Sequence, residues 1–147
     1  IEDVNSETLK QKDSISREKL EILFAEDSPT MRRGVISALK KAGFENITDF
    51  VNGEQALSHI MEHYKNNAQH SLEKVVLISD IEMPRMDGLT LCRSIKQDPD
   101  LNAIHVIMFS SIINSQMVSK CEKVNADGYV TKPETNQLIQ ILDSRCR

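Results

Sequence analysis

The 147-residue sequence lacks any apolar run close to the ~20 residues that a helix needs to cross a bilayer, so we expect no membrane insertion. It also lacks an excess of positive charge: 18 Lys and Arg stand against 22 Asp and Glu, a formal net charge of −4. A chain with this balance has no general attraction for nucleic acid, and we expect no nucleic-acid partner. The amino terminus is polar and acidic, unlike a secretory signal peptide. These absences predict a soluble cytoplasmic domain.

Cysteine is also scarce. The three cysteines, Cys92, Cys121 and Cys146, are odd in number, far apart in the sequence, and mostly set within apolar patterns. A disulfide framework needs pairs, and a structural zinc site needs closely spaced ligands. The cysteines therefore predict neither, and they suit a reducing compartment.

The chain divides into a polar leader and a single domain. Residues 1–18 contain almost no apolar side chains and show no periodicity. Such a segment cannot bury enough surface to offset the entropy of ordering it. We therefore predict a linker or tail over residues 1–18 and one domain over residues 19–147, with a mobile polar loop at residues 65–74. The sequence begins with Ile1 rather than methionine, so we expect it to be part of a longer chain.

Three short apolar runs predict strands of a parallel sheet. They span residues 21–25, 75–79 and 104–109 and are hydrophobic throughout, as expected for strands with helices on both sides. Residues 47–51 and 128–131 are weaker strand candidates. Because segments of helical periodicity separate these strands, we predict a doubly wound, five-stranded parallel α/β fold. The flavodoxin-like strand order 2-1-3-4-5 is the leading topology.

Helices fill the gaps between the predicted strands. A first helix is predicted from the capping pair Ser28-Pro29 to Gly43. A second runs from about residue 54 to 64 and is expected to bury Leu57, Ile60 and Met61. Three more helices are predicted from their apolar positions, which are Leu89, Cys92 and Ile95 in the third, Met117, Cys121 and Val124 in the fourth, and Leu138, Ile141 and Leu142 in the fifth.

Charged and hydroxyl side chains follow four of the predicted strands. In an open parallel sheet, ligands bind outside the carboxyl ends of the strands, at the point where the strand order reverses. The side chains at that edge are, in strand order, Glu26 and Asp27, Asp80, Ser110, and Lys132. The sequence therefore predicts that three carboxylates, a hydroxyl and an ammonium meet in one crevice.

Three carboxylates at one place require a cation. Two like charges ~4 Å apart repel by about 4 kcal/mol at an effective dielectric constant near 20. A divalent ion with oxygen ligands removes this cost, and Mg²⁺ is its natural identity. Lys132 supplies a second positive charge, and Ser110 could donate to a phosphoryl oxygen. With these parts Asp80 can act as a nucleophile and become an aspartyl-phosphate.

Each of these residues also has an ordinary structural explanation. An acidic pair after a strand is often solvated, and Lys132-Pro133 could be solvent-exposed surface residues without a functional role. Ser110-Ser111 could cap the following helix, and Asp87-Gly88 alone is only a turn signal. Their joint placement at four strand ends favours the functional interpretation.

Four segments resemble the receiver domain of two-component response regulators: ILFAEDSPTMR, ISDIEMPRMDGLTLCRSI, VIMFSS and ADGYVTKP. The resemblance covers about residues 20–147. It implies that Asp80 is the phosphoacceptor and that Glu26 and Asp27 are the acidic pair. It also implies that the backbone carbonyl of Glu82 faces the Mg²⁺ ion.

The same resemblance implies how a signal would leave the domain. Ser110 matches the switch hydroxyl of the family, Tyr129 the switch aromatic residue, and Lys132 the phosphate-sensing lysine. Phosphorylation is then expected to move Ser110 toward the phosphoryl group and Tyr129 inward. The surface formed by the fourth helix, fifth strand and fifth helix would change as a result.

Within that family, the segments SDIEMPRMDG and FSS and the polar leader resemble CheV-type chemotaxis coupling proteins. These join an amino-terminal CheW-like adaptor domain to a carboxyl-terminal receiver. The resemblance implies a chemotaxis histidine kinase as phosphoryl donor, and a chemoreceptor complex as a further partner through an adaptor domain outside this sequence. A free-standing receiver of the CheY type shares most of these residues and is the alternative.

Two further functions stay open. A Mg²⁺-dependent phosphohydrolase also forms an aspartyl-phosphate, but its D-x-D pattern is here Asp80-x-Glu82, and we see no cap domain. A receiver-like domain could also act by binding alone, without phosphorylation. We expect no enzyme activity beyond transfer of a phosphoryl group to the domain itself and its slow loss.

Overall fold

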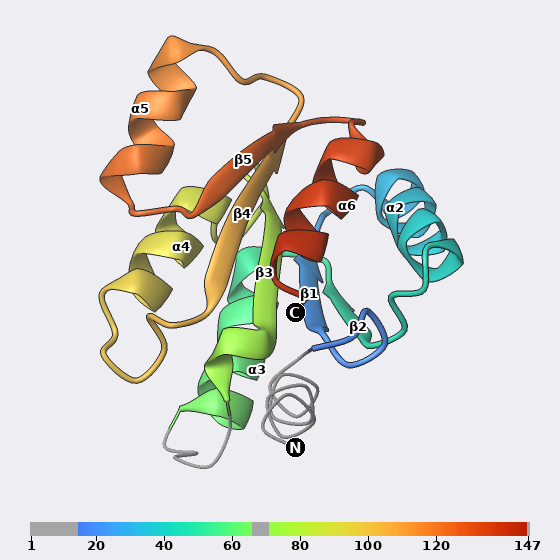
Figure 1. Ribbon diagram of the computed structural model, residues 1–147. Coiled ribbons are helices and arrows are strands. Elements are labelled where there is room, and N and C mark those ends of the chain that lie inside the picture. Colours follow the sequence, from blue (N-terminus) through green and yellow to red (C-terminus); the bar gives the residue numbers. More distant parts are fainter. Residues whose placement is uncertain (1–14, 66–70, 147) are drawn as a thin grey trace, which may run out of the picture.

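The computed structural model describes residues 15–65 and 71–146 (Figure 1). Five parallel strands form one sheet in the order β2-β1-β3-β4-β5, as predicted. The strand bounds agree with the predicted runs to within one residue; they are β1 Glu21–Ala25, β2 Ile47–Phe50, β3 Val75–Asp80, β4 His105–Ser110 and β5 Gly128–Thr131. Predictions for residues 1–14, and for the part of the predicted loop at 66–70, lie outside the described residues.

Helices cover both faces of the sheet (Figure 1). On one face α2 (Pro29–Lys41) and α6 (Thr135–Ser144) pack against a core built around Phe24, Ile78 and Phe109. On the other face lie three helices, α3 (Gly53–Tyr64), α4 (Gly88–Lys96) and α5 (Ser115–Lys123), and a short 3₁₀ turn (Leu72–Lys74) precedes β3. Because both faces are covered, β3 is buried along its whole length.

Short polar side chains define where four of the helices begin. Each side-chain oxygen accepts a hydrogen bond from the backbone N–H three residues later, which satisfies a donor that the helix leaves free. The capping residues are Ser28 for α2, Asn52 for α3, Asp87 for α4 and Asn114 for α5. Each cap lies between the carboxyl end of a strand and the next helix, so the local sequence sets where the connections at that edge of the sheet end.

Helix α3 is rotated relative to the sequence prediction. The helix meets the sheet with Ala56, Ile60 and Tyr64, which are buried at a spacing of four residues. Leu57 and Met61 are one position further along and so lie about 100° around the helix axis. Leu57 is only partly buried but packs against the core, whereas Met61 is 41% exposed, so the prediction that Met61 is buried was wrong.

Smaller deviations occur in the other helices. In α6, Leu138 and Leu142 are buried as predicted, whereas Ile141 is only partly buried at the edge of the same core. In α4, Leu91 is fully buried and Leu89 only partly, because the apolar face centres on Leu91 and Ile95. Each of these residues still contacts the core, so the pattern located the correct helix but not its exact rotation.

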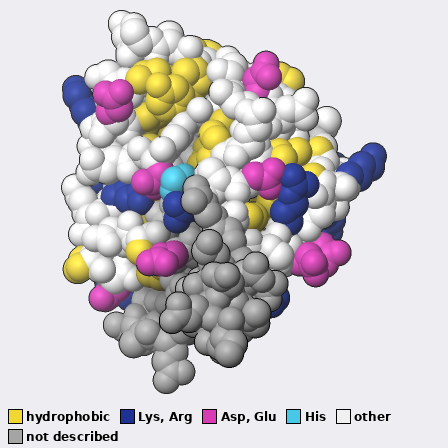
Figure 2. Space-filling model, viewed as in Figure 1, with side chains coloured by type: hydrophobic (Ala, Val, Ile, Leu, Met, Phe, Trp, Pro, Cys, Tyr) yellow, Lys and Arg dark blue, Asp and Glu magenta, His cyan; other side chains and the backbone are white. Residues whose placement is uncertain are grey.

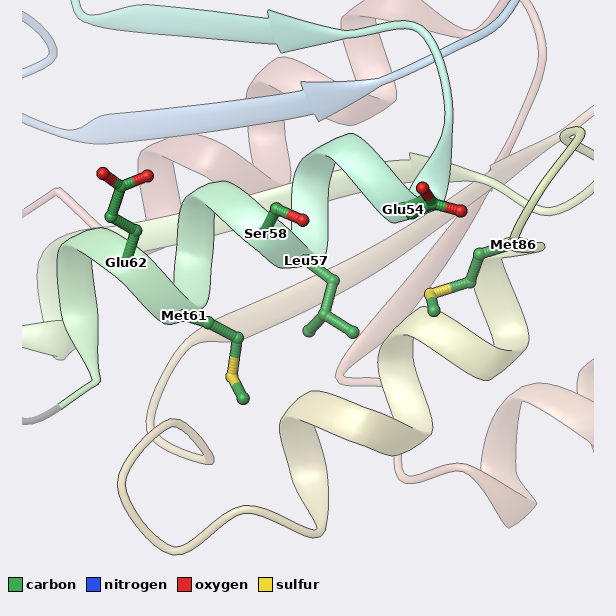
Figure 3. Close-up of a pocket in the computed structure, with 6 residues that line it drawn as sticks. All are labelled: Glu54, Leu57, Ser58, Met61, Glu62 and Met86. Carbon is green, nitrogen blue, oxygen red and sulfur yellow. The ribbon is translucent and has the colours of Figure 1, made fainter.

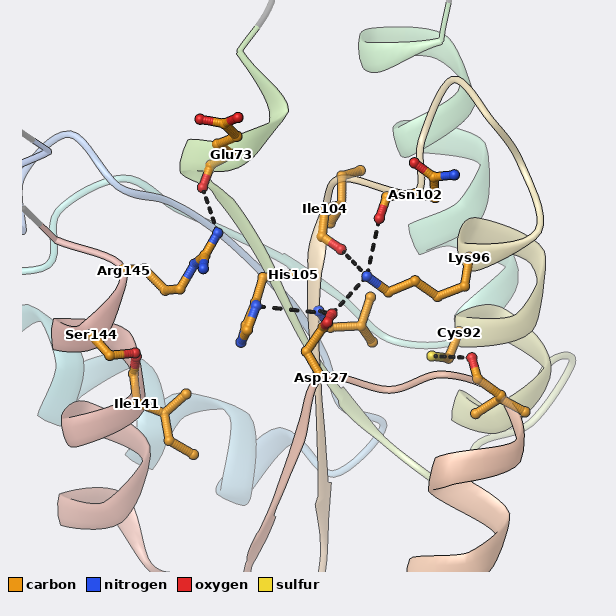
Figure 4. Close-up of polar contacts among 12 residues, drawn as sticks. Glu73, Cys92, Lys96, Asn102, Ile104, His105, Asp127, Ile141, Ser144 and Arg145 are labelled. Carbon is orange, nitrogen blue, oxygen red and sulfur yellow. Dashed lines mark hydrogen bonds and ion pairs between the residues drawn. The ribbon is translucent and has the colours of Figure 1, made fainter. Parts of the chain in front are cut away.

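A polar cluster closes the amino-terminal ends of β4 and β5 (Figure 4). Asp127 Oδ2 accepts a 2.8 Å hydrogen bond from the Val106 N–H and pairs with Lys96 Nζ at 2.6 Å. Lys96 also donates to the carbonyl of Ile104 at 2.7 Å. Burial lowers the pKa of the neighbouring His105, although Asp127 opposes the shift. These contacts satisfy backbone groups at the start of two strands, which gives the cluster a structural role.

The surface carries charges of both signs. On the face shown in Figure 2, acidic and basic side chains are interspersed with hydrophobic ones. Arg17, from the end of the predicted leader, lies against the domain: its Nε donates to Asp143 Oδ1 at 2.7 Å, and its guanidinium stands 5.1 Å from the centre of the Phe44 ring. Among the described residues, none of the helices has both the length and the apolar character needed to span a membrane.

Candidate functional site

Three carboxylates meet at the carboxyl edge of the sheet. Oxygen atoms of Glu26, Asp27 and Asp80 all lie within 4.8 Å of one another. The strand register explains this proximity, because Ala25 of β1 pairs with Ser79 of β3 and the next residue on each strand is acidic. Glu26 is 1% exposed and Asp80 6% exposed, whereas Asp27 faces solvent. The predicted cluster therefore has two buried members and one open to water.

Lys132 brings a positive charge to the two buried carboxylates. Its Nζ lies 2.6 Å from Glu26 Oε1 and 3.1 Å from Asp80 Oδ1. The side chain starts at the end of β5 and passes over the end of β4, where Nζ stands 5.6 Å from the centre of the Phe109 ring. The backbone N–H of Lys132 donates to the carbonyl of Ser110 at 2.8 Å, and this bond holds the Lys132 backbone beside the end of β4.

Burial and charge shift the protonation equilibria of this site. Desolvation, and then repulsion from Glu26, raises the pKa of Asp80 to about 6, although Lys132 opposes the shift. For Lys132, burial by itself lowers the pKa, but the carboxylates of Glu26 and Asp80 outweigh it and raise the pKa. The site thus holds one ammonium and three carboxylates, and it retains an excess of negative charge that a further cation could balance.

The backbone around Glu26 is held by contacts that the sequence did not predict. Arg32, on the first turn of α2, donates from its guanidinium to the carbonyl of Glu26 at 2.7 Å and pairs with Asp49 at 3.0 Å. The Ser28 N–H donates to Glu26 Oε2 at 3.1 Å. The Ser28 cap signals that α2 begins beside the acidic pair, but only the folded chain shows that Arg32 turns back over the end of β1.

Two glycines hold the loop that leaves Asp80. The Gly88 N–H donates to the carbonyl of Ile81 at 2.8 Å, and a Cβ on Gly88 would overlap the backbone carbonyl of Asp80. A Cβ on Gly53 would likewise overlap the carbonyl of Met86 in the same loop. Only glycine permits these close approaches. From the sequence, Asp87-Gly88 indicated a turn, but its packing against Asp80 was not predicted.

The other predicted site residues lie near this edge without joining the cluster. Ser110 is buried at the end of β4, and its hydroxyl accepts a hydrogen bond from the Ile112 N–H at 3.2 Å. Tyr129, on β5, is 40% exposed, and the side chain of Glu82 is exposed. Among the described residues, none of these three side chains bonds to the acidic cluster. The structure thus assembles Glu26, Asp27, Asp80 and Lys132 as predicted.

The geometry agrees with a known family. Residues 22–143 match the response regulator receiver domain. The chain belongs to this family. Receiver domains are signalling domains rather than typical enzymes. The similarity predicted from the four motif segments is therefore confirmed, and with it the assignment of the chain to two-component signalling.

Three relatives illustrate the breadth of this family. The receiver domain is 33% identical over 130 residues to the chemotaxis protein CheV3 of Helicobacter pylori, covering 84% of this chain but 41% of CheV3. It is 30% identical to the chemotaxis protein CheY1 of the same species, covering 82% of this chain and 91% of CheY1. The solved receiver domain of a signal transduction histidine kinase from Syntrophus aciditrophicus is 30% identical with a TM-score of 0.70, covering 85% of this chain and 88% of that one.

Proposed function

We propose that this receiver domain accepts a phosphoryl group on Asp80 from the phosphohistidine of a histidine kinase in a chemotaxis pathway, with Mg²⁺ as cofactor. The observation that carries the proposal is the position of the Lys132 ammonium, 3.1 Å from Asp80 and 2.6 Å from Glu26. A fixed cation beside a buried carboxylate can balance the negative charge that a phosphoryl group brings. Family membership and the similarity to two chemotaxis proteins support the same conclusion.

The donor set of the cluster fits Mg²⁺. Carboxylate oxygens are the ligands that this hard cation prefers, and the solvent-facing side of the cluster at Asp27 suits an ion that keeps several waters. In the proposal, Asp27, Asp80 and the backbone carbonyl of Glu82 hold the ion. Glu26 acts through a water or from outside the coordination sphere. When bound, Mg²⁺ supplies positive charge to the phosphoryl oxygens.

The transfer itself needs one nucleophile. A carboxylate oxygen of Asp80 attacks the phosphorus of the phosphohistidine and forms a new O–P bond. The N–P bond breaks, and its electron pair stays on the imidazole nitrogen of the kinase. Since burial beside Glu26 raises the pKa of Asp80, positive charge placed at this edge increases the fraction of Asp80 that is ionised and reactive. Lys132 remains in place to pair with the transferred group.

Ser110 and Tyr129 are positioned to convert the modification into a change of surface. In the proposal, the Ser110 hydroxyl leaves its bond to Ile112 and donates to a phosphoryl oxygen, and Tyr129 turns inward. Hydrogen bonds to a charged group contribute roughly 1.5–3 kcal/mol each. Two or three of them approach the ~5.5 kcal/mol that moves a two-state equilibrium from 1:99 to 99:1. The surface of α5, β5 and α6 is then the output face.

We further propose a CheV-type context. The aligned region is 41% of CheV3, so a CheV-type protein would contain a second domain, and residues 1–18 would be the linker to it. Its CheW-like adaptor domain would connect the receiver to a chemoreceptor complex and the chemotaxis kinase. The alternative is a free-standing CheY-type regulator, which is supported by the 91% coverage of CheY1.

Acetyl phosphate tests the phosphoacceptor assignment directly. Incubation of the domain with acetyl phosphate and Mg²⁺ should add one phosphoryl group that is stable to acid and labile to alkali, as expected of an acyl phosphate. Intact-mass spectrometry followed by peptide mapping should place it on Asp80. The variant Asp80→Ala should gain no label, and an undiminished label in that variant would show that another residue is the acceptor.

Lys132→Ala separates acceptance of the phosphoryl group from the response to it. This variant should still be labelled, but NMR shifts of Tyr129 and of α5 should no longer change on labelling. Normal NMR shift changes in the labelled variant would show that Lys132 has no role in the conformational switch. Steady turnover of small phosphate esters by the unmodified domain would instead indicate a phosphohydrolase.

A further inference from the structure

A groove with an apolar floor runs beside α3, on the same side of the sheet as α4 (Figure 3). Its hollow measures about 500 Å³. Leu57 and Met61 extend from α3 toward α4, and Met86 extends toward them from the loop between β3 and α4. Met61 is 41% exposed, and it is one of four large hydrophobic side chains that are exposed among the described residues. Leu57 and Met86 are partly buried, so their outer atoms join Met61 to form an apolar hollow, a feature typical of an interaction surface.

The composition of the floor suits a peptide. Methionine has three rotatable bonds and a polarisable sulfur, so it adapts its shape to different apolar partners. Two of the three floor residues are methionines, and they lie on separate segments of the chain. An amphipathic helix is the usual occupant of such a groove, and it places its apolar residues at spacings of three and four.

The rim of the groove is acidic. Glu54, Ser58 and Glu62 follow one another at intervals of four along α3 and form a polar row beside the apolar floor. At 1.5 Å of rise per residue, the two glutamates lie about 12 Å apart along the helix axis. Glu54 is within 3.7 Å of Arg85, but both side chains are more than half exposed, so this pair is weak and readily exchanged.

We propose that this groove binds an amphipathic helix of a partner protein that carries two basic residues about eight positions apart beside a short apolar stripe. Such a helix would match the two glutamates and the apolar floor at once. A second copy of this chain is a poorer occupant. A twofold contact through the same face would place Glu54 and Glu62 of one copy next to the same glutamates of the other, and like charges repel. The bound helix would touch Met86, in the loop that begins directly after Asp80 and Ile81.

Fluorescence anisotropy with designed peptides tests this surface without any phosphoryl donor, so its outcome is independent of the proposed phosphorylation. The probe is a labelled alanine-based helix of about 14 residues with two leucines four positions apart and two lysines eight positions apart on the adjoining edge. The matched control carries glutamates in place of the lysines. The lysine peptide should bind at least about tenfold more tightly.

Variants locate the binding. The double substitution Glu54→Lys with Glu62→Lys should weaken the lysine peptide at least about tenfold and strengthen the glutamate peptide. Met61→Gln should weaken both peptides. Glu122→Lys, a charge reversal of an exposed glutamate on α5, should leave the affinity unchanged. Thermal unfolding of each variant verifies that it is folded.

Several results would overturn the proposal. If the two peptides bind equally, or if neither binds, the proposed pairing of basic residues with Glu54 and Glu62 is wrong. Loss of binding in Glu122→Lys but not in the groove variants would place the peptide elsewhere. NMR shifts of the Met61 and Met86 methyl groups that depend on protein concentration without peptide would show that a second copy covers the groove. Binding of anionic vesicles through the same methyl groups would assign the groove to a membrane surface.

Discussion

Asp80 illustrates how a single residue combines stability and function. Its pKa is raised to about 6, first by burial and then by the charge of Glu26. The folded state therefore holds a proton on Asp80 more tightly than the unfolded state does, where a carboxyl of this type has a pKa of about 3.9. As pH rises from about 4 through 6, ionisation of Asp80 costs folding free energy. The same charge that makes Asp80 a nucleophile destabilises the fold around it.

Asp80→Asn should therefore stabilise the metal-free domain at neutral pH. We expect a gain in unfolding free energy on the order of 1–3 kcal/mol at pH 7.5, because the variant removes a buried charge next to Glu26. The gain should be small at pH 4 and vanish at lower pH, where the wild-type carboxyl becomes protonated in the unfolded state as well. Urea unfolding in the presence of a chelator at the two pH values measures this difference. The exposed Asp100→Asn serves as control and should change little; a gain at pH 7.5 that persists unchanged at pH 4 would contradict the assignment.

Residue type alone pointed to the main side chains of the site. Asp27, Asp80 and Lys132 lie at or just beyond the carboxyl ends of three strands, and the structure brings all three to one edge. Arg32 was not predicted, because its role depends on the path of its side chain back to the Glu26 carbonyl. Contacts to backbone atoms leave no signature in the residue pattern, so only the folded chain shows them.

At the scale of elements, the loop from Asp80 to α4 depends on close backbone packing. Gly88 begins α4 and lies directly against the carbonyl of Asp80, where no Cβ can fit. Because both groups belong to the backbone, the contact can be relieved only if the loop or the end of β3 moves. The loop conformation and the position of Asp80 are thus coupled.

Gly88→Ala should destabilise the domain by about 1–3 kcal/mol, because the added methyl group forces a backbone shift. It should also slow labelling of Asp80 by acetyl phosphate, since the carboxylate moves with the strand end. Gly34→Ala is the matched control: Gly34 lies within α2 with nothing within 4 Å of the added Cβ. That substitution should be neutral or stabilise by up to about 1 kcal/mol. Equal effects of the two substitutions in chemical denaturation would argue against the packing role of Gly88.

The rotation of α3 is a second property of elements. Helical periodicity identified an apolar stripe that included Leu57, Ile60 and Met61. In the structure the buried positions are instead Ala56, Ile60 and Tyr64. Met61 lies outside this face and is left at the groove.

At the scale of the whole molecule, the two edges of the sheet differ in charge: the charges are paired at one edge and unbalanced at the other. The amino-terminal ends of β4 and β5 carry a compact pair between Lys96 and Asp127. The carboxyl edge instead carries three carboxylates and one ammonium. A cation at the carboxyl edge should therefore stabilise the entire fold, since it relieves repulsion that only the folded state contains.

Magnesium should accordingly raise the melting temperature. At ten times its dissociation constant, a ligand specific for the folded state adds about 1.4 kcal/mol to the unfolding free energy. Calorimetry with and without MgCl₂ measures the shift, with Asp27→Asn and Asp80→Asn expected to reduce it. If saturating Mg²⁺ leaves the melting temperature of the wild type unchanged, as in both variants, the result would argue against a metal site at this cluster.

The sequence by itself determined the number of strands, their approximate bounds, their order and the residues at their carboxyl ends. These follow from local signals: continuous apolar runs, capping residues, and the rule that parallel strands end at one edge. Only the tertiary structure decided the rotation of α3, the reach of Lys132 across β4, and the fit of Gly88 against Asp80. These depend on distances between segments far apart in the chain, and close packing of the folded molecule, rather than any local residue preference, determines such distances.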